Sequence, residues 1–143
     1  MPHQENKHMA EIKNISIAKT RTTPAIGTYV SDELAYISIA GESYPENALA
    51  WYADVFAWLK AVFSLDENIA FKMTINLTYC NTLSAKMLLD IVDMIERHYL
   101  NSTRSVMVTF RVQEDDESMI EMAHELFSEW DKDRYTIELY ECL

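Results

Sequence analysis

The sequence predicts a single two-layer α/β domain, with a mixed sheet of four to five strands and three helices on one of its faces. Three observations predict it. Five segments alternate apolar and polar residues with period two, and three longer segments carry apolar residues at helical spacing, in regular alternation along the chain. Every expected strand also keeps one polar face, whereas strands buried on both faces read as continuous apolar runs, so helices are expected on one side only.

Two short strands are expected to open the fold. Ile15 and Ile17 alternate with polar residues over 14–19, and residues 34–40 alternate in the same way. Between them, Thr23-Pro24 is expected to end the first strand, because proline cannot donate a hydrogen bond to a neighbouring strand. The two segments are therefore expected to form a pair.

A long helix is expected next. Ser43 and Glu46 have the spacing of a capping box, and Pro45 would lie in the first turn, where its missing N–H costs nothing. The helix is expected to run to about Ser64.

The rest of the chain alternates strands and helices. Strands are expected over 71–80, 106–112 and 135–140, joined by right-handed crossovers. One helix is expected from about Thr82 to Tyr99, with an apolar stripe made of Leu83, Met87, Leu88, Ile91, Ile95 and Tyr99. Asp115 or Asp116 is expected to cap the last helix, which bears Met119, Met122, Leu126 and Trp130. The open side of the sheet is expected to carry Thr74, Asn76, Thr78, Thr109, Arg111, Thr136 and Glu138.

Composition and charge exclude several classes of function. The 143 residues are 49% hydrophobic, which fits one globular core over 11–143 after a disordered or vector-derived polar tail at 1–10. Glycine occurs only at Gly27 and Gly41, so the glycine-rich loops of dinucleotide-binding and P-loop proteins are impossible. The net charge of −11 repels phosphate backbones and anionic lipids, so neither nucleic acid nor a membrane is an expected partner.

Cysteine usage and hydropathy predict a soluble, cytoplasmic protein. Cys80 and Cys142 form neither a disulfide framework nor a metal-type spacing, and the sequence shows no secretory segment and no apolar span.

The candidate functional residues lie where a strand passes directly into a helix. The run Tyr79-Cys80-Asn81-Thr82-Leu83-Ser84 places hydroxyl groups at the carboxyl end of a strand and over a helix N-terminus, where α/β sheets bind ligands. A structural role accounts for the same residues, because Asn81 or Thr82 would cap the helix and Ser84 would lie in its first turn. The residues alone leave both interpretations open.

Three blocks of sequence resemble the SiaC family of bacterial regulatory phosphoproteins, in the family's order and spacing. They are Thr23-Pro24-Ala25-Ile26, Gly41-Glu42-Ser43-Tyr44-Pro45-Glu46-Asn47 and Leu77-Thr78-Tyr79-Cys80-Asn81-Thr82-Leu83-Ser84-Ala85-Lys86. The resemblance extends from about Thr22 to the C-terminus, and its S-Y-P-E-N and Y-x-N-T-x-S-x-K motifs are specific in combination. It implies a fold like that of the STAS anti-sigma-factor antagonists. It also implies phosphorylation of the threonine in the N-T motif, here Thr82, although Leu83 stands where the family usually has a serine.

The resemblance further implies a partner-switching circuit. The chain would be a non-enzymatic adaptor without cofactor or metal, phosphorylated by a serine/threonine kinase and dephosphorylated by a metal-dependent phosphatase. Its unmodified form would bind an effector, in the family a diguanylate cyclase, so cyclic-di-GMP output and biofilm formation are the implied readouts.

The chemistry of such a switch is coherent with this sequence. A phosphate on Thr82 adds about −1.5 to −2 charges at a helix N-terminus, which tolerates an anion, whereas a partner packed over Thr82 would have to bury that dianion. Lys86, one turn along, would neutralise part of the charge or is an ordinary solvated lysine. Partner recognition is expected from Ser43, Tyr44, Pro45, Glu46, Asn47, Tyr79, Asn81, Ser84 and Lys86.

The first helix carries two apolar stripes about 100° apart, and a two-layer domain needs only one of them for its sheet. Trp51 and Trp58 lie on the second stripe. They are expected either on a partner or dimer surface or in packing between helices, because aromatic residues serve both roles.

Three alternatives remain. Cys80 as a nucleophile would need His98 or His124 as its base, but His98 lies about 24 Å along the following helix. The acidic run Glu114-Asp115-Asp116-Glu117 would bind Mg²⁺ or simply start a helix. The third alternative is a constitutive homodimeric scaffold without phosphorylation.

Overall fold

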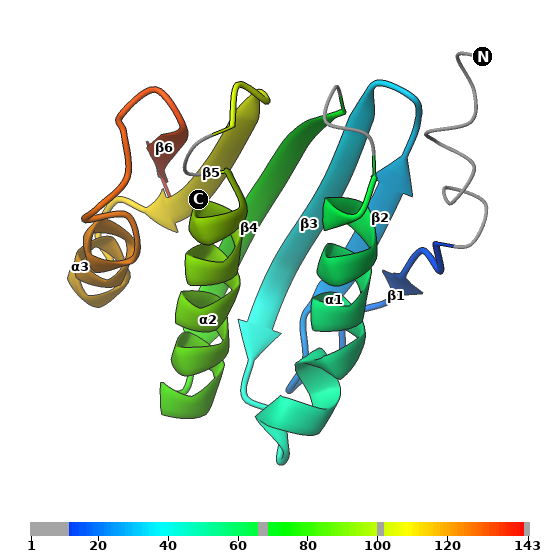
Figure 1. Cartoon of the computed structure of the whole chain (residues 1–143). Coiled ribbons are helices and arrows are strands. Elements are labelled where there is room, and N and C mark those ends of the chain that lie inside the picture. The colour runs from blue at the N-terminus through cyan, green and yellow to red at the C-terminus, as the bar shows by residue number, and fades with distance from the viewer. Residues whose placement is uncertain (1–11, 66–68, 100–101, 142–143) are drawn as a thin grey trace, which may run out of the picture.

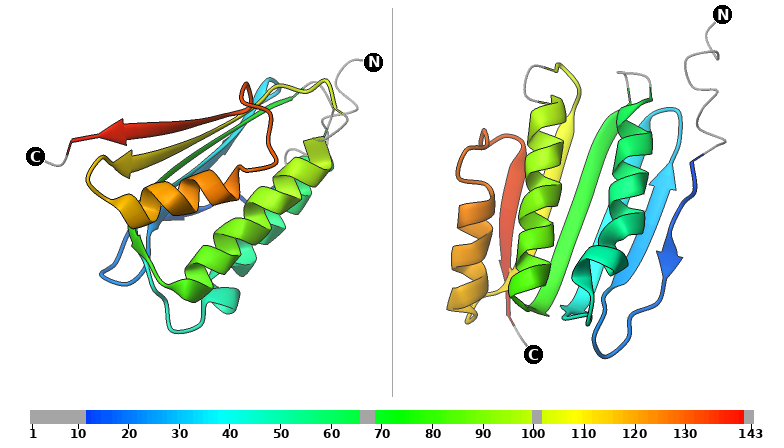
Figure 2. Two further views of the ribbon diagram at one scale, coloured as in Figure 1. Left: turned by 90° about the vertical axis from the view of Figure 1, so that its left-hand side faces the viewer. Right: turned by 60° about the horizontal axis from the view of Figure 1, so that its bottom comes forward.

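The sheet has one face covered by helices and one face open. The structure is a computed structural model and describes residues 12–65, 69–99 and 102–141, so the tail expected at 1–10 lies outside it. Within these ranges the chain forms six strands in one sheet, with three helices packed on the same face (Figure 1). The other face carries no helix of the described residues (Figure 2). The predicted two-layer α/β class is confirmed.

The strands follow each other across the sheet in chain order. They are β1 (Ser16–Ile17), β2 (Ala25–Val30), β3 (Leu34–Ser43), β4 (Ala70–Cys80), β5 (Val106–Gln113) and β6 (Tyr135–Tyr140). The helices are α1 (Ala48–Phe63), α2 (Thr82–Tyr99) and α3 (Glu117–Leu126). The first three strands are antiparallel and β3 to β6 are parallel, each parallel pair being joined by one helix.

The strand β2 is a correction to the sequence prediction. The segments 14–19 and 34–40 were expected to pair with each other, but β2 lies between β1 and β3 and pairs with both. Only Ile26 of β2 is fully buried, so the segment lacks the alternation that marks a half-buried strand. Pro24 precedes β2 rather than interrupting it, which is a position that a strand tolerates.

The core fills the space between the sheet and the helices. The sheet contributes Ile37, Ile39, Phe71, Met73, Ile75, Val108 and Phe110, and the helices contribute Tyr52, Leu59, Leu88, Ile91 and Ile95, all at most 1% exposed. Burying each such side chain stabilises the fold by roughly 1.5–3 kcal/mol. Leu83, expected in the stripe of α2, is 56% exposed, because Ser84 takes the inward position of the first turn.

The start of α1 also differs from the expectation. Ser43 is the last residue of β3 and not a helix cap, because β3 continues alongside β4 as far as Cys80. The cap is Asn47, whose Oδ1 accepts a hydrogen bond of 3.1 Å from the backbone N–H of Ala50. The capping box expected from Ser43 and Glu46 is therefore wrong.

The cap of the last helix is one of the two residues predicted for it. Asp116 caps α3 and accepts from the N–H of Met119 at 3.2 Å. The helix ends at Leu126, so Trp130, expected on it, lies in the connection to β6.

A β-bulge shifts the register where β3 and β4 end. Gly41 lies opposite Leu77 but Glu42 lies opposite Tyr79, so Thr78 is the extra residue. The bulge reverses the facing of the last two residues: Tyr79 is 49% exposed, and Cys80 points toward the helices, contrary to the simple alternation expected from the sequence. Gly41 has φ +127°, a conformation that residues with a Cβ rarely adopt.

The open face is polar, as expected. Asn76 accepts a hydrogen bond from the hydroxyl of Tyr140 at 3.0 Å, and Arg111 pairs with Glu138 at 2.9 Å. Of the helices in the described ranges, none has the length and apolar character needed to cross a membrane.

Replacing Gly41 should destabilise the protein far more than replacing Gly27. Gly41→Ala forces a Cβ into a positive φ and to 3.4 Å from the Cα of Pro24, so a loss of about 1–3 kcal/mol in the free energy of unfolding is expected. At Gly27 the added Cβ meets only the Ser38 hydroxyl at 3.5 Å, an ordinary contact, so Gly27→Ala is the matched control. Urea unfolding of both variants measures the difference, and equal losses would contradict the assigned strain.

Candidate functional site

The two junctions singled out in the sequence meet at one end of the sheet. Ser43 ends β3 and lies opposite Cys80, which ends β4, and the backbone N–H of Asn81 donates to the carbonyl of Ser43 at 3.0 Å. The N-termini of α1 and α2 therefore emerge side by side, at the lower end of Figure 1. The segments that follow β3 and β4 therefore share one end of the sheet.

Asn81 is the cap of α2. Its Oδ1 accepts from the N–H of Ser84 at 2.9 Å, and its carbonyl accepts from the N–H of Ala85, also at 2.9 Å. Thr82 is thus the first helical residue, and its side chain is exposed. Asn81 caps the helix, and Thr82 does not. A purely structural role at this junction therefore accounts for Asn81 but leaves the exposed hydroxyl of Thr82 unexplained.

A chain of three buried hydroxyls lies directly beneath this turn. The Oγ of Ser43 is 2.7 Å from the hydroxyl of Tyr52 and donates to the Oγ of Ser84 at 2.8 Å. All three residues are 0% exposed, and they come from β3, α1 and α2. A buried hydroxyl network must be satisfied within itself, because no water reaches it to replace a lost partner. The network therefore fixes the first turn of α2 relative to α1 and the sheet.

Burial changes the acidity of two groups in this region. Desolvation raises the pKa of Tyr52 to about 12, although the hydrogen bonds with Ser43 and Ser84 oppose the shift. Burial and the charge of Asp116 raise the pKa of the Cys80 thiol. Because the Cys80 Sγ also donates to the sulfur of Met122 at 3.7 Å, Cys80 is a neutral thiol facing the helices and not an activated nucleophile.

Burial divides the residues expected to contact a partner. Ser43 and Ser84 are fully buried and Pro45 is buried as well, so they support the surface and do not form it. Tyr44 and Asn81 are partly exposed. Glu46, Asn47, Tyr79, Thr82 and Lys86 are exposed, and the rings of Tyr44 and Tyr79 meet edge to face at 5.5 Å.

Lys86 is paired within its own helix. Its Nζ lies 3.2 Å from the Oδ1 of Asp90, four residues along α2, and both side chains are exposed. Such a pair contributes little to stability, so the ammonium can exchange Asp90 for another anion at small cost.

The two tryptophans of α1 have different surroundings. Trp58 is 2% exposed, and its indole N–H donates to the Oδ1 of Asn14 at 3.0 Å. The segment that leads into β1 covers it, so Trp58 belongs to internal packing and not to an exposed partner surface. Trp51 is partly buried, with its ring 4.7 Å from that of Tyr52 in an edge-to-face contact.

The sequence patterns missed a set of exposed leucines on α1 and α2. Leu49 in the first turn of α1 is 70% exposed, Leu83 is 56% exposed and Leu89 is 42% exposed. Nothing in the sequence indicated that these leucines are exposed. Periodicity shows which apolar residues share one face of a helix, but not which of them the sheet covers. Leu49, Leu83 and Tyr79 lie at the end of the sheet where α1 and α2 begin, and Leu89 lies two turns further along α2. Exposed apolar side chains of this kind are typical of protein interfaces.

The acidic run before α3 provides the Asp116 cap. In the part of the chain that the structure describes, no group of three or more His, Cys, Asp or Glu side chains is placed to hold a metal ion.

Comparison with known proteins identifies a family and a relative of this chain. One family model matches residues 17–139, and its description is SiaC family regulatory phosphoprotein. An uncharacterized protein of Pseudomonas aeruginosa strain UCBPP-PA14 is 30% identical over 115 residues, which are 80% of this chain and 87% of that protein.

Two solved structures share the fold. The crystal structure of the diguanylate cyclase SiaD in complex with its activator SiaC, from Pseudomonas aeruginosa, contains a chain that matches with a TM-score of 0.78 at 25% identity, over 89% of this chain and 100% of that one. Apo-SiaC of the same organism matches with a TM-score of 0.72 at 26% identity, over 88% and 98% of the two chains.

Removing the Ser84 hydroxyl should destabilise the protein, and removing the Thr82 hydroxyl should not. Ser84→Ala leaves the buried Ser43 hydroxyl without its acceptor, which costs about 1–3 kcal/mol. Thr82→Ala changes an exposed group, so the expected loss is within about 0.5 kcal/mol. Urea unfolding followed by circular dichroism compares them, and equal midpoints would contradict the buried network.

The raised pKa of Tyr52 predicts a loss of stability in alkali. The unfolded tyrosine ionises near pH 10 and the folded one near pH 12, so the stabilisation is complete below pH 10 and is lost as pH rises toward 12. At pH 11 the wild type should lose about 1 kcal/mol more than Tyr52→Phe, relative to each protein at pH 8. Tyr29→Phe, at a tyrosine that is 55% exposed, is the control and should follow the wild type.

Proposed function

The chain belongs to the SiaC family of regulatory phosphoproteins, and on that basis we propose that it is a signalling adaptor switched by reversible phosphorylation of Thr82. Its role is regulatory, like that of the activator SiaC, and not enzymatic. The unmodified form binds and regulates an effector in a bacterial partner-switching pathway of the cytoplasm. A serine/threonine kinase adds the phosphate and a metal-dependent phosphatase removes it.

The exposure of the two hydroxyls in the first turn of α2 supports Thr82 as the acceptor. Thr82 is exposed, whereas Ser84 is 0% exposed and bonded to Ser43 at 2.8 Å. A kinase must reach the hydroxyl that it modifies, and reaching Ser84 would require the first turn of α2 to unfold. Ser84 therefore does not replace Thr82.

The position of Thr82 supports a phosphate that leaves the fold intact. The first turn of a helix has N–H groups without intrahelical partners and the positive end of the helix dipole, both of which favour an anion. Lys86 lies one turn further along and is exposed. The hydroxyl network beneath the turn keeps α2 in place, so the modification acts on the surface and not on the fold.

The surface around Thr82 supports a partner that packs over it. Leu49, Tyr79 and Leu83 are between 49% and 70% exposed at this end of the sheet. A partner covering this apolar surface would have to desolvate a dianion on Thr82. A penalty of about 3 kcal/mol weakens binding more than a hundredfold.

The proposed effector is a diguanylate cyclase. The structural relative SiaC is described as the activator of the cyclase SiaD, and the matched chain is covered completely by this one. The proposed output is therefore a change in cyclic-di-GMP, and with it in biofilm formation. The constitutive dimer has less support, because Trp58 of its expected surface is buried.

Phosphorylation of Thr82 should be both necessary and sufficient to release the effector. Protein isolated from its native cells should carry one phosphate that peptide mass spectrometry maps to Thr82, and Thr82→Ala should lack it. Unmodified protein and Thr82→Ala should bind the cyclase from the same cells equally, and the phosphorylated form at least a hundredfold more weakly, as measured by calorimetry.

Two variants make this test specific. Thr78→Ala, at an exposed threonine on the neighbouring strand, should retain both the phosphate and its effect. If Thr82→Ala still loses the cyclase after treatment with the kinase, or if phosphorylation leaves affinity unchanged, Thr82 is not the switch.

A further inference from the structure

The two edges of the sheet differ in how they are protected from pairing with another strand. The edge strand β1 has only two residues. The edge strand β6 has six residues in unbroken register with β5, and in Figure 2 (left) it runs along the side of the sheet with α3 below it. Proteins usually protect a long edge strand with a proline, a lysine or a bulge, and β6 contains none of these. Its only charged residue, Glu138, is paired with Arg111 of β5.

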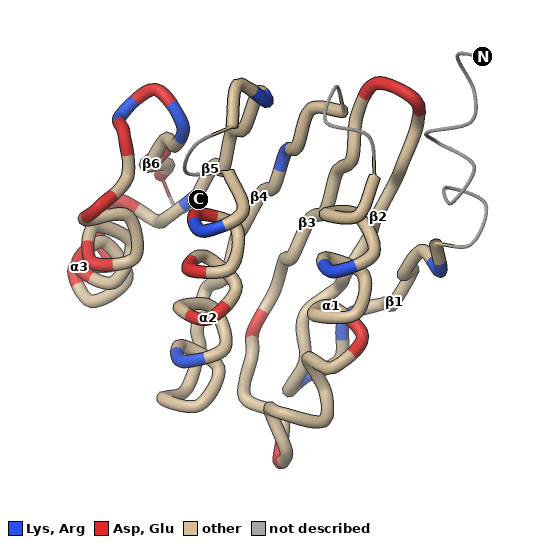
Figure 3. The backbone as a smooth tube through the Cα atoms, viewed as in Figure 1, with Lys and Arg blue, Asp and Glu red and all other residues tan. Residues whose placement is uncertain are grey.

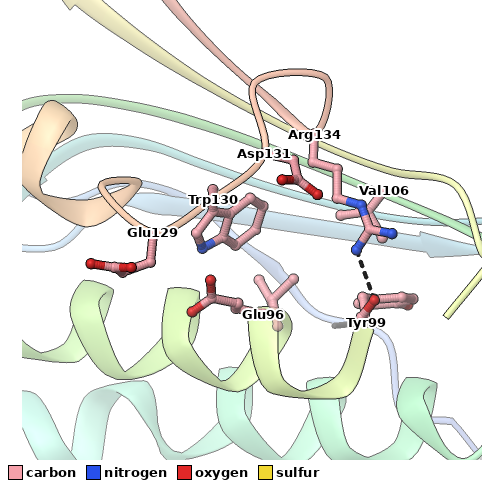
Figure 4. A pocket seen from close by; sticks show the side chains of 8 residues that line it. Glu96, Tyr99, Val106, Glu129, Trp130, Asp131 and Arg134 are labelled. Atoms are coloured by element: carbon pink, nitrogen blue, oxygen red, sulfur yellow. Dashed lines mark hydrogen bonds between the residues drawn. The ribbon is translucent and has the colours of Figure 1, made fainter. Parts of the chain in front are cut away.

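The start of β6 is fixed to the end of α2. Arg134, the residue before β6, donates from its two terminal nitrogens to the carbonyls of Tyr99 at 2.7 Å and Ser102 at 3.1 Å. In Figure 4 the dashed line marks the bond to Tyr99, beside a small pocket that Glu96 and Trp130 also line. The edge strand is therefore ordered before any partner arrives, and an ordered strand loses less conformational entropy when it pairs.

The backbone of β6 offers unpaired hydrogen-bonding groups at every second residue. The carbonyls of Arg134 and Tyr140 accept backbone hydrogen bonds of 3.0 and 2.8 Å from β5 and from the residue that follows it. Backbone groups of successive strand residues point to opposite sides, so those of Tyr135, Ile137 and Leu139 point away from β5. Because β6 is the last strand of the sheet, no described residue bonds to these outward groups.

The same three residues form the apolar side of β6. They lie opposite buried residues of β5, so their side chains are on the face of the sheet that the helices cover. The ring of Tyr135 stacks on that of Phe127 at 4.8 Å, and Ile137 is partly buried against the core, but Leu139 is 52% exposed. A strand added to this edge would therefore pair the outward backbone groups and cover Leu139 at the same time.

A second copy of β6 is complementary to this edge when it runs antiparallel about a two-fold axis at Ile137. Ile137 then lies opposite its own counterpart, and Tyr135 lies opposite Leu139 of the other copy. All the outward backbone groups face one another, and each of these residue pairs exchanges two hydrogen bonds. The ring of Tyr135 covers the exposed leucine, as cross-strand aromatic pairs do. On the open face of the sheet Glu138 lies opposite Thr136.

The charge of Glu138 distinguishes this register from the next one. An axis at Glu138 keeps the same hydrogen-bonding residues, but it places the two Glu138 carboxylates directly opposite each other, which destabilises a strand pair. A parallel arrangement has no two-fold axis and leaves the association open-ended. The sequence of β6 therefore favours one closed arrangement with a second copy of itself.

We propose that β6 pairs antiparallel with β6 of a second copy of this chain, which joins the two sheets into one across an axis at Ile137. An interface of two six-residue strands is small, so the dimer is weak and reversible. It includes neither the exposed residues around Thr82 nor the helix α1, from which the sequence suggested a dimer surface. The proposal does not rest on phosphorylation of Thr82.

The overall charge of the chain opposes this association. Each copy has a net charge of −11, and in Figure 3 the acidic positions gather on α3 and on the connection to β6, next to the proposed interface. Salt screens this repulsion between copies. Dimerisation should therefore strengthen as the salt concentration rises from about 0.05 M to about 0.5 M, whereas an interface held by ion pairs would weaken.

Hydrogen exchange of single amides tests the proposal on the wild-type protein alone. The amides of Tyr135, Ile137 and Leu139 should exchange about fivefold more slowly at about 1 mM protein than at about 10 µM, as expected for a dissociation constant of about 100 µM. The amides of Thr136 and Glu138 face β5 in the monomer as well, so their exchange should change little. Exchange labelling read out by NMR measures each amide, and sedimentation over the same concentrations should show a monomer that converts to a dimer.

Two proline variants separate the edge of β6 from other exposed leucines. Leu139→Pro removes an N–H that points away from β5, a position where an edge strand tolerates proline, so the monomer should fold and the dimer should weaken at least about tenfold. Leu83→Pro is the matched control, because Leu83 is 56% exposed and lies in the first turn of α2, where proline is tolerated. It should dimerise like the wild type. Circular dichroism checks the fold of both variants, and if Leu139→Pro does not fold, amide exchange in the wild type decides.

Three outcomes overturn the proposal. The first is a protein that stays monomeric at every concentration and salt tested. The second is an equal change in exchange at all amides of β6, and the third is equal dimerisation of the two proline variants. Protection of the outward amides only after the effector is added would show that the edge binds a strand of another protein and not a second copy. None of these outcomes bears on phosphorylation of Thr82.

Discussion

The hydrogen bonds made by Ser43 hold the candidate site together. Its carbonyl accepts from the backbone of Asn81, and its hydroxyl links Tyr52 of α1 to Ser84 of α2. One residue at the end of β3 thus fixes where both helices begin, in a place that water does not reach. The exposed face of the first turn of α2 can vary in sequence or in charge because its buried face is fixed in this way.

Local patterns in the sequence predicted those parts of the fold that local forces determine. The bounds of α2 and β6 agree with the periodicity, and the Asp116 cap was one of two predicted alternatives. The strand β2 was not predictable, because its partners and not its own alternation make it a strand. The extension of β3 to Ser43 was missed for the same reason, since it depends on β4 running beside it.

Prediction from local sequence has the same limit for the single side chains of the site. The motif identified the junction, but the exposure of each residue depends on tertiary packing. Ser43 and Ser84 looked like surface hydroxyls and are the most deeply buried of the group, while Leu83 looked like core and is exposed. Trp58 was ambiguous because its cover, Asn14, lies 44 residues away in the sequence. The pocket that Glu96 shares with Trp130 and Arg134 was not predicted, because only tertiary packing brings α2 against the connection between α3 and β6.

The burial of Ser84 has a consequence for how a signal could be encoded at this junction. This chain has Leu83 where the family usually has a serine, and the hydroxyl of Ser84 is enclosed, so Thr82 has the one exposed hydroxyl in the first turn of α2. Under the proposed phosphorylation of Thr82, this turn would carry at most one phosphate per molecule, and each molecule would be either modified or unmodified. A pathway built on it would set its dose response through the fraction of molecules modified, and any sharp threshold would have to arise from the opposing enzymes or from limiting amounts of partner.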